Sequence, residues 1–144
     1  RADLSQGGGD DDRALAFSAR HADVHLFQSA AAEGLAARIS RLKILAEAEG
    51  RYVRAGLIQP LLLRDDPDSA ICDSSGRTLA PGTLVASYDE AAGRLAAYVE
   101  AGVTELLLEA TPTLEEAYRT GQHLLPRLRT LTHQLHINPL HSAA

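Results

Sequence analysis

The segment Gly56-Leu57-Ile58-Gln59-Pro60-Leu61-Leu62-Leu63 decides the fold, because it is a nearly continuous apolar run that ends at Arg64. A strand that is buried on both faces, as in a parallel sheet, has this composition. Pro60 counts against a regular ladder, since proline has no N–H to donate to a neighbouring strand. We therefore predict a buried strand of a parallel sheet, interrupted by one residue that does not suit it.

Helical patterns lie on both sides of this run. Over residues 34–49 the apolar positions recur at helical spacing, and Gly50 follows as a left-handed cap. These positions are Leu35, Ile39, Leu42 and Ala46. An earlier helix is predicted from Asp10-Asp11-Asp12, whose carboxylates suit a helix N-terminus, to about Ala22.

Two capping boxes mark two later helices. Ser87-Tyr88-Asp89-Glu90 opens a helix that Gly102 closes, and Thr113-Leu114-Glu115-Glu116 opens a second one. The second helix is predicted to have an apolar stripe made of Leu114, Ala117, Gly121, Leu124 and Leu128. Further strands are predicted over 23–27 and 103–108, a long loop over 64–81, and a polar, fraying tail over 130–144.

The alternation of helices and strands predicts an α/β protein with a parallel sheet. Three strands make a small sheet with both edges open. A complete (β/α)8 barrel needs roughly 250 residues, so a chain of this length supplies about three of its units. The chain begins with Arg1 and contains no methionine, which favours a fragment of a longer protein.

Composition excludes several classes of function. The chain has 14 basic and 19 acidic residues and a net charge of −5, so it lacks the positive surface of a nucleic-acid-binding protein. Its single cysteine, Cys72, excludes an internal disulfide framework and a cysteine-based zinc site. No apolar run reaches the roughly 18 residues of a membrane span. A reducing, cytoplasmic location is expected, without a membrane partner.

Three parts of the chain together resemble a known family. They are Gly8-Gly9 with the strand Ala22-Asp23-Val24-His25-Leu26; the run from Gly56 to Arg64; and a C-terminal set that comprises Leu84-Val85-Ala86-Ser87, Ala101-Gly102-Val103, Leu114-Glu115-Glu116-Ala117-Tyr118-Arg119 and Leu125-Pro126. Over residues 6–129 the chain is similar to the C-terminal part of the luciferase-like flavin-dependent monooxygenases, within them to the alkanesulfonate monooxygenase branch.

The resemblance implies a fold and an activity. The fold would be the C-terminal portion of a (β/α)8 barrel over 1–129, followed by the tail 130–144. The intact protein would use reduced FMN, supplied by a separate flavin reductase, and O2 to oxygenate a small organic substrate, with an alkanesulfonate as one candidate. Gly8 and Gly9 would lie near the flavin phosphate, although a glycine pair equally suits a plain turn between a strand and a helix. Assembly of identical subunits stays open.

The residues that carry chemistry in this family do not match. Its sulfonate branch has an arginine and a histidine on the strand at 56–64, where this chain has Ile58 and Pro60, and a tyrosine where this chain has Thr111. Neither Ile58 nor Pro60 can shuttle a proton. No catalytic residue is therefore predicted, and the chain is not expected to be active alone. Two alternatives follow: a catalytically degenerate subunit, or a deazaflavin-dependent oxidoreductase of the same superfamily.

Other polar residues give weaker signals. His133, His136 and His141 could bind zinc, but in a polar tail solvated side chains are favoured. Asp65, Asp66 and Asp68 could bind a hard cation, but a solvated acidic loop is favoured. No metal site is predicted.

Five further residues have a functional and a plain interpretation. Glu109 has the best claim to a catalytic role, because strand C-termini face a barrel's active site, but helix capping or a salt bridge is favoured. His25, like His21, is expected to be a packed or rim residue. Cys72 has no activating cation nearby in the sequence and is expected to be inert. In the family that the chain resembles, Tyr118 belongs to helix packing.

Overall fold

A computed structural model describes residues 4–5, 12–29, 34–110, 113–132 and 136–140 of the chain. Its elements are β1 (Leu4–Ser5), α1 (Asp12–His21), β2 (Val24–Gln28), α2 (Leu35–Ala48), β3 (Arg54–Arg64), α3 (Pro67–Ser74), β4 (Leu84–Ser87), α4 (Tyr88–Glu100), β5 (Glu105–Ala110), α5 (Leu114–Leu131) and β6 (His136–Leu140). No helix within these ranges has the length and apolarity to cross a membrane.

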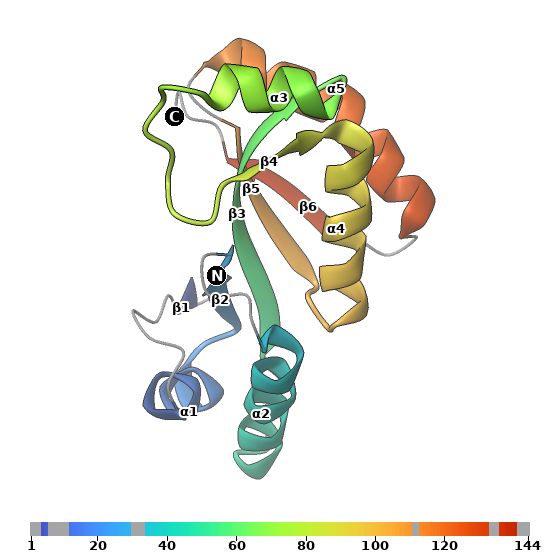
Figure 1. Ribbon diagram of the computed structural model, residues 1–144. Coiled ribbons are helices and arrows are strands. Elements are labelled where there is room, and N and C mark those ends of the chain that lie inside the picture. Colours follow the sequence, from blue (N-terminus) through green and yellow to red (C-terminus); the bar gives the residue numbers. More distant parts are fainter. Residues whose placement is uncertain (1–3, 6–11, 30–33, 111–112, 133–135, 141–144) are drawn as a thin grey trace.

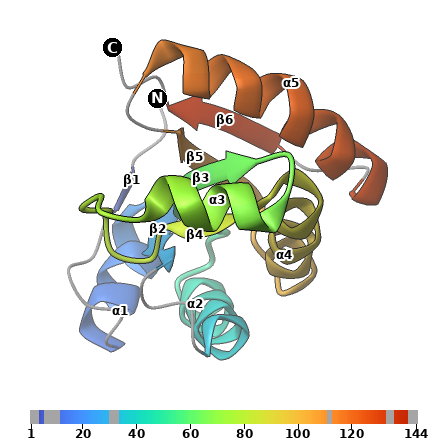
Figure 2. The same cartoon turned by 45° about the horizontal axis from the view of Figure 1, so that its top comes forward.

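All strand pairings in the sheet are parallel, in the order β1-β2-β3-β5-β6. The long strand β3 runs through the middle, with α1 and α2 beside its lower half and α4 and α5 beside its upper half (Figure 1). In the turned view α1, α2, α4 and α5 lie in an arc around the strands (Figure 2). The predicted α/β class with a parallel sheet is confirmed.

Strand β3 has two neighbours on one of its edges, placed end to end. Strand β2 pairs with its first half, up to Ile58, and β4 pairs with its last residues, from Leu61 onward. The N–H of Arg54 donates to the carbonyl of Asp23, so alternation directs the backbone of Pro60 to the same edge. Pro60 therefore stands in the gap between β2 and β4, where its missing N–H leaves no ladder bond unmade.

The large core lies between the sheet and the helices. Helix α2 contributes the four positions predicted from periodicity, all buried: Leu35, Ile39, Leu42 and Ala46. Strands β3 and β5 contribute Leu57 and Leu106, both with no exposed surface. Gly50 has the predicted left-handed conformation, with φ of 67°.

The capping box predicted for α4 is confirmed, because Ser87 and Glu90 bond to each other in both directions. At α5 only half of the predicted box forms: the Thr113 side chain accepts from the N–H of Glu116, but the Glu116 carboxylate binds Arg64. The predicted stripe of α5 is only partly right. Leu124 and Leu128 are fully buried, but Leu114 is 63% exposed.

Three elements differ from the predictions. The expected loop over 64–81 contains α3, which begins at Pro67 behind an Asp66 cap, a combination typical of a helix start. Residues 84–87 form β4 as well as the cap of α4. Within the expected fraying tail, α5 continues to Leu131 and β6 pairs with β5. The boundary between residues 1–129 and 130–144 as separate units stays a prediction.

Candidate functional site

The carboxyl ends of the parallel strands form one edge of the sheet, the carboxyl edge, and this is where ligands of such sheets bind. Strands β2, β3, β4 and β5 end there at Gln28, Arg64, Ser87 and Ala110. The helix after each strand begins near the same edge, so the helix N-termini and the strand ends define the candidate site.

The face of the sheet turned away from the large core, the inner face, is apolar in its middle. Val24, Leu26 and Ile58 form a separate buried cluster, and the half-buried Leu107 packs against it. At the opposite, amino end of this face, Arg54 donates to the carboxylate of Glu105. Ile58 stands at the position where the sulfonate branch has an arginine, and here it belongs to an apolar surface.

Side-chain hydrogen bonds connect β3 to the segment before β4 in the gap beside Pro60. The side-chain amide of Gln59 donates to the carbonyl of Pro60 at 2.8 Å and to the carbonyl of Gly82 at 2.9 Å. The hydroxyl of Ser29 donates to the same Gly82 carbonyl at 3.2 Å. The backbone before β4 therefore completes the edge that β2 and β4 leave open, and Gln59 uses its donors in structure rather than toward a ligand.

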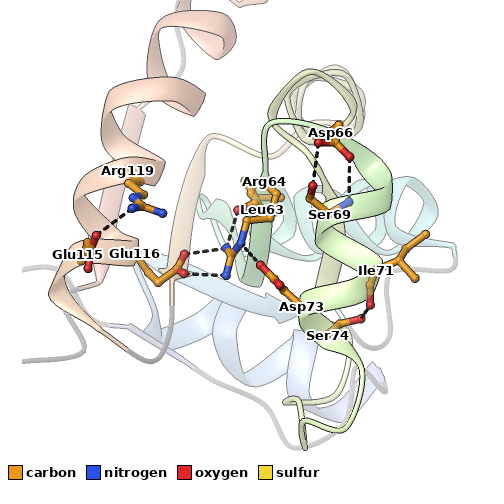
Figure 3. A network of polar contacts seen from close by, with 10 residues as sticks. All are labelled: Leu63, Arg64, Asp66, Ser69, Ile71, Asp73, Ser74, Glu115, Glu116 and Arg119. Atoms are coloured by element: carbon orange, nitrogen blue, oxygen red, sulfur yellow. Dashed lines mark hydrogen bonds and ion pairs between the residues drawn. The ribbon is translucent and has the colours of Figure 1, made fainter.

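Arg64 organises the end of β3 (Figure 3). Its guanidinium binds Asp73 of α3 at 2.6 Å and Glu116 of α5 at 2.8 Å, and donates to the carbonyl of Leu63. Burial lowers the pKa of Arg64, but the bonds to Asp73 and Glu116 outweigh it, so its pKa is raised above the ordinary value. The network joins β3, α3 and α5, which are distant in sequence. The charge of Arg64 is balanced by carboxylates of the chain itself.

Three helix N-termini at this edge, those of α3, α4 and α5, are already satisfied by the chain's own side chains, whereas α2 begins at Gly34 without a side-chain cap or an acidic first turn. Asp66 accepts from the N–H and the hydroxyl of Ser69, and these bonds lower its pKa. Helices α4 and α5 have the caps described above and two acidic residues each in their first turns. Carboxylates at these positions repel a phosphate, so α3, α4 and α5 do not fit the phosphate end of a flavin.

Tyr88 is the one aromatic side chain of α4's first turn and is 4% exposed. Its ring lies 5.0 Å from that of His123 and below the guanidinium of Arg127. Burial, followed by the negative charges of Asp65 and Glu116, raises the pKa of its hydroxyl. Tyr88 is not among the site residues predicted from the sequence, because its place inside the capping box suggests only a helix start.

Glu109 lies at the end of β5, in register with Pro60 of β3. Alternation along β5 places it on the inner face, as it does Glu105 and Leu107. Its side chain is intermediate in exposure. Its position at the carboxyl edge agrees with the prediction, while a catalytic role stays a prediction.

His25 and His21, which flank the start of β2, lie in different environments. His25 is fully buried on the core side of β2, with its Nδ1 2.6 Å from the hydroxyl of Ser18 and its ring against Phe27. It is the packed residue that was expected. His21 is exposed on α1, where it lies against Phe17.

The remaining candidates contribute little to the site. No group of three metal-ligating side chains comes together in the described ranges. His136 belongs to β6, and Cys72 is exposed on α3. Tyr118 is 70% exposed, so the helix-packing role implied by the resemblance is wrong for this chain. Gly8, Gly9, Thr111, His133 and His141 lie outside the described residues.

A shallow hollow of about 250 Å³ lies away from the carboxyl edge, between the last turns of α2 and the start of β3. Lys43, Glu47, Arg51 and Tyr52 line it. Arg51 already donates to the carbonyls of Ala19 and Ala22, both at 2.9 Å. The hollow is therefore built from residues that hold α1, α2 and the start of β3 together.

No family model matches the sequence. Solved structures do match the fold. A riboflavin lyase matches with a TM-score of 0.72 at 16% identity, over 88% of this chain and 42% of its own. A long-chain alkane monooxygenase matches with 0.69 at 14% identity, over 87% of this chain and 40% of its own. The coenzyme F420 dependent tetrahydromethanopterin reductase of Methanopyrus kandleri matches with 0.65 at 12% identity, over 87% and 50%.

These likenesses establish the fold. The chain is a portion of a (β/α)8-type barrel, as predicted, and it spans about 40 to 50% of the length of the structures that it matches. The fold agrees with the resemblance to the luciferase-like superfamily and does not select a subtype within it.

Proposed function

We propose that this chain supplies part of the active-site wall of a flavin-type oxidoreductase. The observation that carries the proposal is the parallel sheet, which matches barrels whose names include a flavin substrate, an alkane monooxygenase and a deazaflavin-dependent reductase. In such barrels the reacting groups gather at the carboxyl edge. Here that edge presents the apolar inner face and the side chain of Glu109.

The residues present suit the ring system of a flavin better than its phosphate. Ile58, Leu107 and Pro60 are apolar residues of the inner face, and Pro60 is the nearest of them to the carboxyl edge. The N-termini of α3, α4 and α5 are capped and acidic, as described, and would repel a phosphate. A flavin held by the intact protein would thus have its phosphate elsewhere, and Gly8-Gly9 is the predicted place. The bound flavin would supply the redox chemistry, and this chain would shield one side of it from water.

The finer proposal is a two-component monooxygenase that uses reduced FMN from a flavin reductase, with O2 and a small organic substrate. The sequence resemblance supports it, and an alkanesulfonate is its candidate substrate. A deazaflavin in place of FMN is the alternative that the reductase likeness supports.

A second candidate function is a catalytically degenerate subunit that stabilises a partner. The specific observation in its favour is the chemistry of the inner face. The two positions that carry an arginine and a histidine in the sulfonate branch are Ile58 and Pro60, and the polar groups beside them, Gln59 and Arg64, already bond within the fold.

Anaerobic titration tests both candidates. The protein, as the longest chain that its gene encodes, is mixed with reduced FMN or with a reduced deazaflavin, and its melting temperature is followed. An oxidoreductase should be protected by one of them, by about 2.7 kcal/mol at a hundredfold excess over Kd. Protection by neither flavin contradicts the oxidoreductase and leaves the degenerate subunit.

A further inference from the structure

Two polar side chains at the carboxyl edge, Gln28 and Glu109, are not used within the described fold. Gln28 ends β2, Glu109 lies one residue before the end of β5, and both are intermediate in exposure. Within the described ranges, neither side chain has a hydrogen bond or an ion pair. By contrast, the following polar side chains at the strand ends and in the helix caps bond to the chain itself: Ser29, Gln59, Arg64, Asp66, Ser87 and Glu116.

Alternation along the strands places both side chains on the inner face. Gln28 follows the two β2 residues of the inner cluster at two-residue spacing, and Glu109 follows Leu107 in the same way. Gln28 lies in register with Ile58 of β3. Glu109 lies in register with Pro60, two residues nearer the carboxyl edge. The two polar groups therefore stand on either side of an apolar stretch of β3.

The chemistry of these two groups favours one class of ligand. A carboxylate only accepts hydrogen bonds, so Glu109 suits an ammonium, an amide N–H or a hydroxyl group and repels an anion. A side-chain amide both donates and accepts, so Gln28 suits a polar group of any charge. Arg64 at the end of β3 does not offset the charge of Glu109, because Asp73 and Glu116 already bind its guanidinium.

We infer that Gln28 and Glu109 bind the polar end of the substrate, and that this substrate is a cationic or neutral molecule with a hydrogen-bond donor. Its apolar part lies against Ile58 and Leu107. The inference rests on the proposed function, because it assigns a substrate class to the same carboxyl edge. This class differs from the alkanesulfonate that the sequence resemblance suggests, since a sulfonate has no donor and Glu109 repels its charge.

Three ligands with the same alkyl chain test the choice of polar group: hexylammonium, hexan-1-ol and hexane-1-sulfonate. Each is titrated into the longest chain that the gene encodes, and the amide resonances of Leu107 and Glu109 report binding at this place. Hexylammonium should bind at least about fivefold more tightly than hexane-1-sulfonate, as one partly exposed ion pair allows. Hexan-1-ol should lie between them. This ranking needs no variant and so does not depend on the folding of one.

Variants then assign the preference to the two residues. Glu109→Gln keeps the shape of the side chain and removes its charge, so it should weaken hexylammonium about fivefold and leave hexan-1-ol within about twofold. The matched control is Asp68→Asn, which removes one charge at an exposed position in the first turn of α3 and should leave all three affinities within about twofold. Gln28→Leu should weaken both hexylammonium and hexan-1-ol by about fivefold, through one lost hydrogen bond.

Several outcomes overturn the inference. They are no binding of any of the three ligands, binding of hexane-1-sulfonate at least as tight as that of hexylammonium, no effect of Gln28→Leu, and equal effects of Asp68→Asn and Glu109→Gln. Failure of the proposed function has a different result: neither reduced flavin protects the protein, while the preference for hexylammonium supports the binding pair. Protection by a flavin together with a preference for the sulfonate rejects this inference alone.

Discussion

The two faces of the sheet are buried in different ways. The face under the helices packs one continuous cluster of 22 buried apolar residues, drawn from four helices (α1, α2, α4 and α5) and from strands on both sides of β3. The inner face has a separate cluster of only three buried apolar residues and an ion pair at its amino end. The difference indicates that the helix-covered face stabilises the fold, while the inner face is shaped for what it meets in a complete barrel.

Two neighbouring leucines of β5, one on each face of the sheet, test most directly whether the two faces contribute differently to stability. Leu106 points into the large cluster with no exposed surface, and Leu107 packs on the inner face. Leu106→Ala should lower the free energy of unfolding by roughly 3 kcal/mol, through lost burial and a cavity, and Leu107→Ala by roughly 1 kcal/mol. Urea denaturation of both variants measures this. Equal losses would mean that the two faces contribute alike.

The Arg64 network tests whether the carboxyl edge is stabilised by charge. Arg64→Gln removes the partner of Glu116, whose side chain is 17% exposed, and of Asp73, whose side chain is 47% exposed, and should cost about 2 kcal/mol of unfolding free energy, most of it from the more buried Glu116. The double variant Arg64→Gln with Glu116→Gln should recover part of this loss. Denaturation of the single and double variants gives the coupling. If the double variant loses the sum of both single effects, the network has no pairwise coupling.

How much of the fold and of the candidate site can be predicted from the sequence depends on how far apart along the chain the interacting residues lie. Helix α2 and the caps of α4 and α5 follow from local spacing, so they were predicted. Helix α3 was missed although Asp66-Pro67 is a helix-start signal, because the polar composition around it favoured a loop. The Arg64 network joins β3, α3 and α5, and no local pattern connects those residues. The edge position of β6 likewise depends on a partner that lies about thirty residues earlier.

Gly56 tests how tightly the inner face is packed. An added Cβ would lie 2.6 Å from Leu26 Cδ2 and 3.3 Å from Val24 Cγ1. The nearest atom ends a flexible side chain, so we expect Gly56→Ala to cost about 1 kcal/mol rather than to prevent folding. Thermal unfolding against Gly93→Ala, a helix position with open space around its Cβ, provides the control. A loss above about 3 kcal/mol would show a rigid inner face.

The smallest expected effect is the pH dependence of the α3 cap. The pKa of Asp66 is lowered below its ordinary 3.8 by the bonds from Ser69. Its contribution to stability is therefore complete above 3.8 and is lost as the pH falls through the lower pKa of the folded state. The amide resonance of Ser69 should titrate with a midpoint below 3.8, and it should not titrate this way in Asp66→Asn. A midpoint at or above 3.8 contradicts the cap.

Pro60 has a consequence for the chain before it is folded. The run from Leu57 to Leu63 is the most apolar strand of the protein, and its β5 edge has no partner until the later part of the chain has been synthesised. Segments of six or seven apolar residues without proline are those that stack into intermolecular β-structure. Pro60 divides this run into two shorter pieces. Because it stands in the gap between β2 and β4, we expect it to lower the tendency of the nascent chain to aggregate without removing a hydrogen bond from the finished sheet.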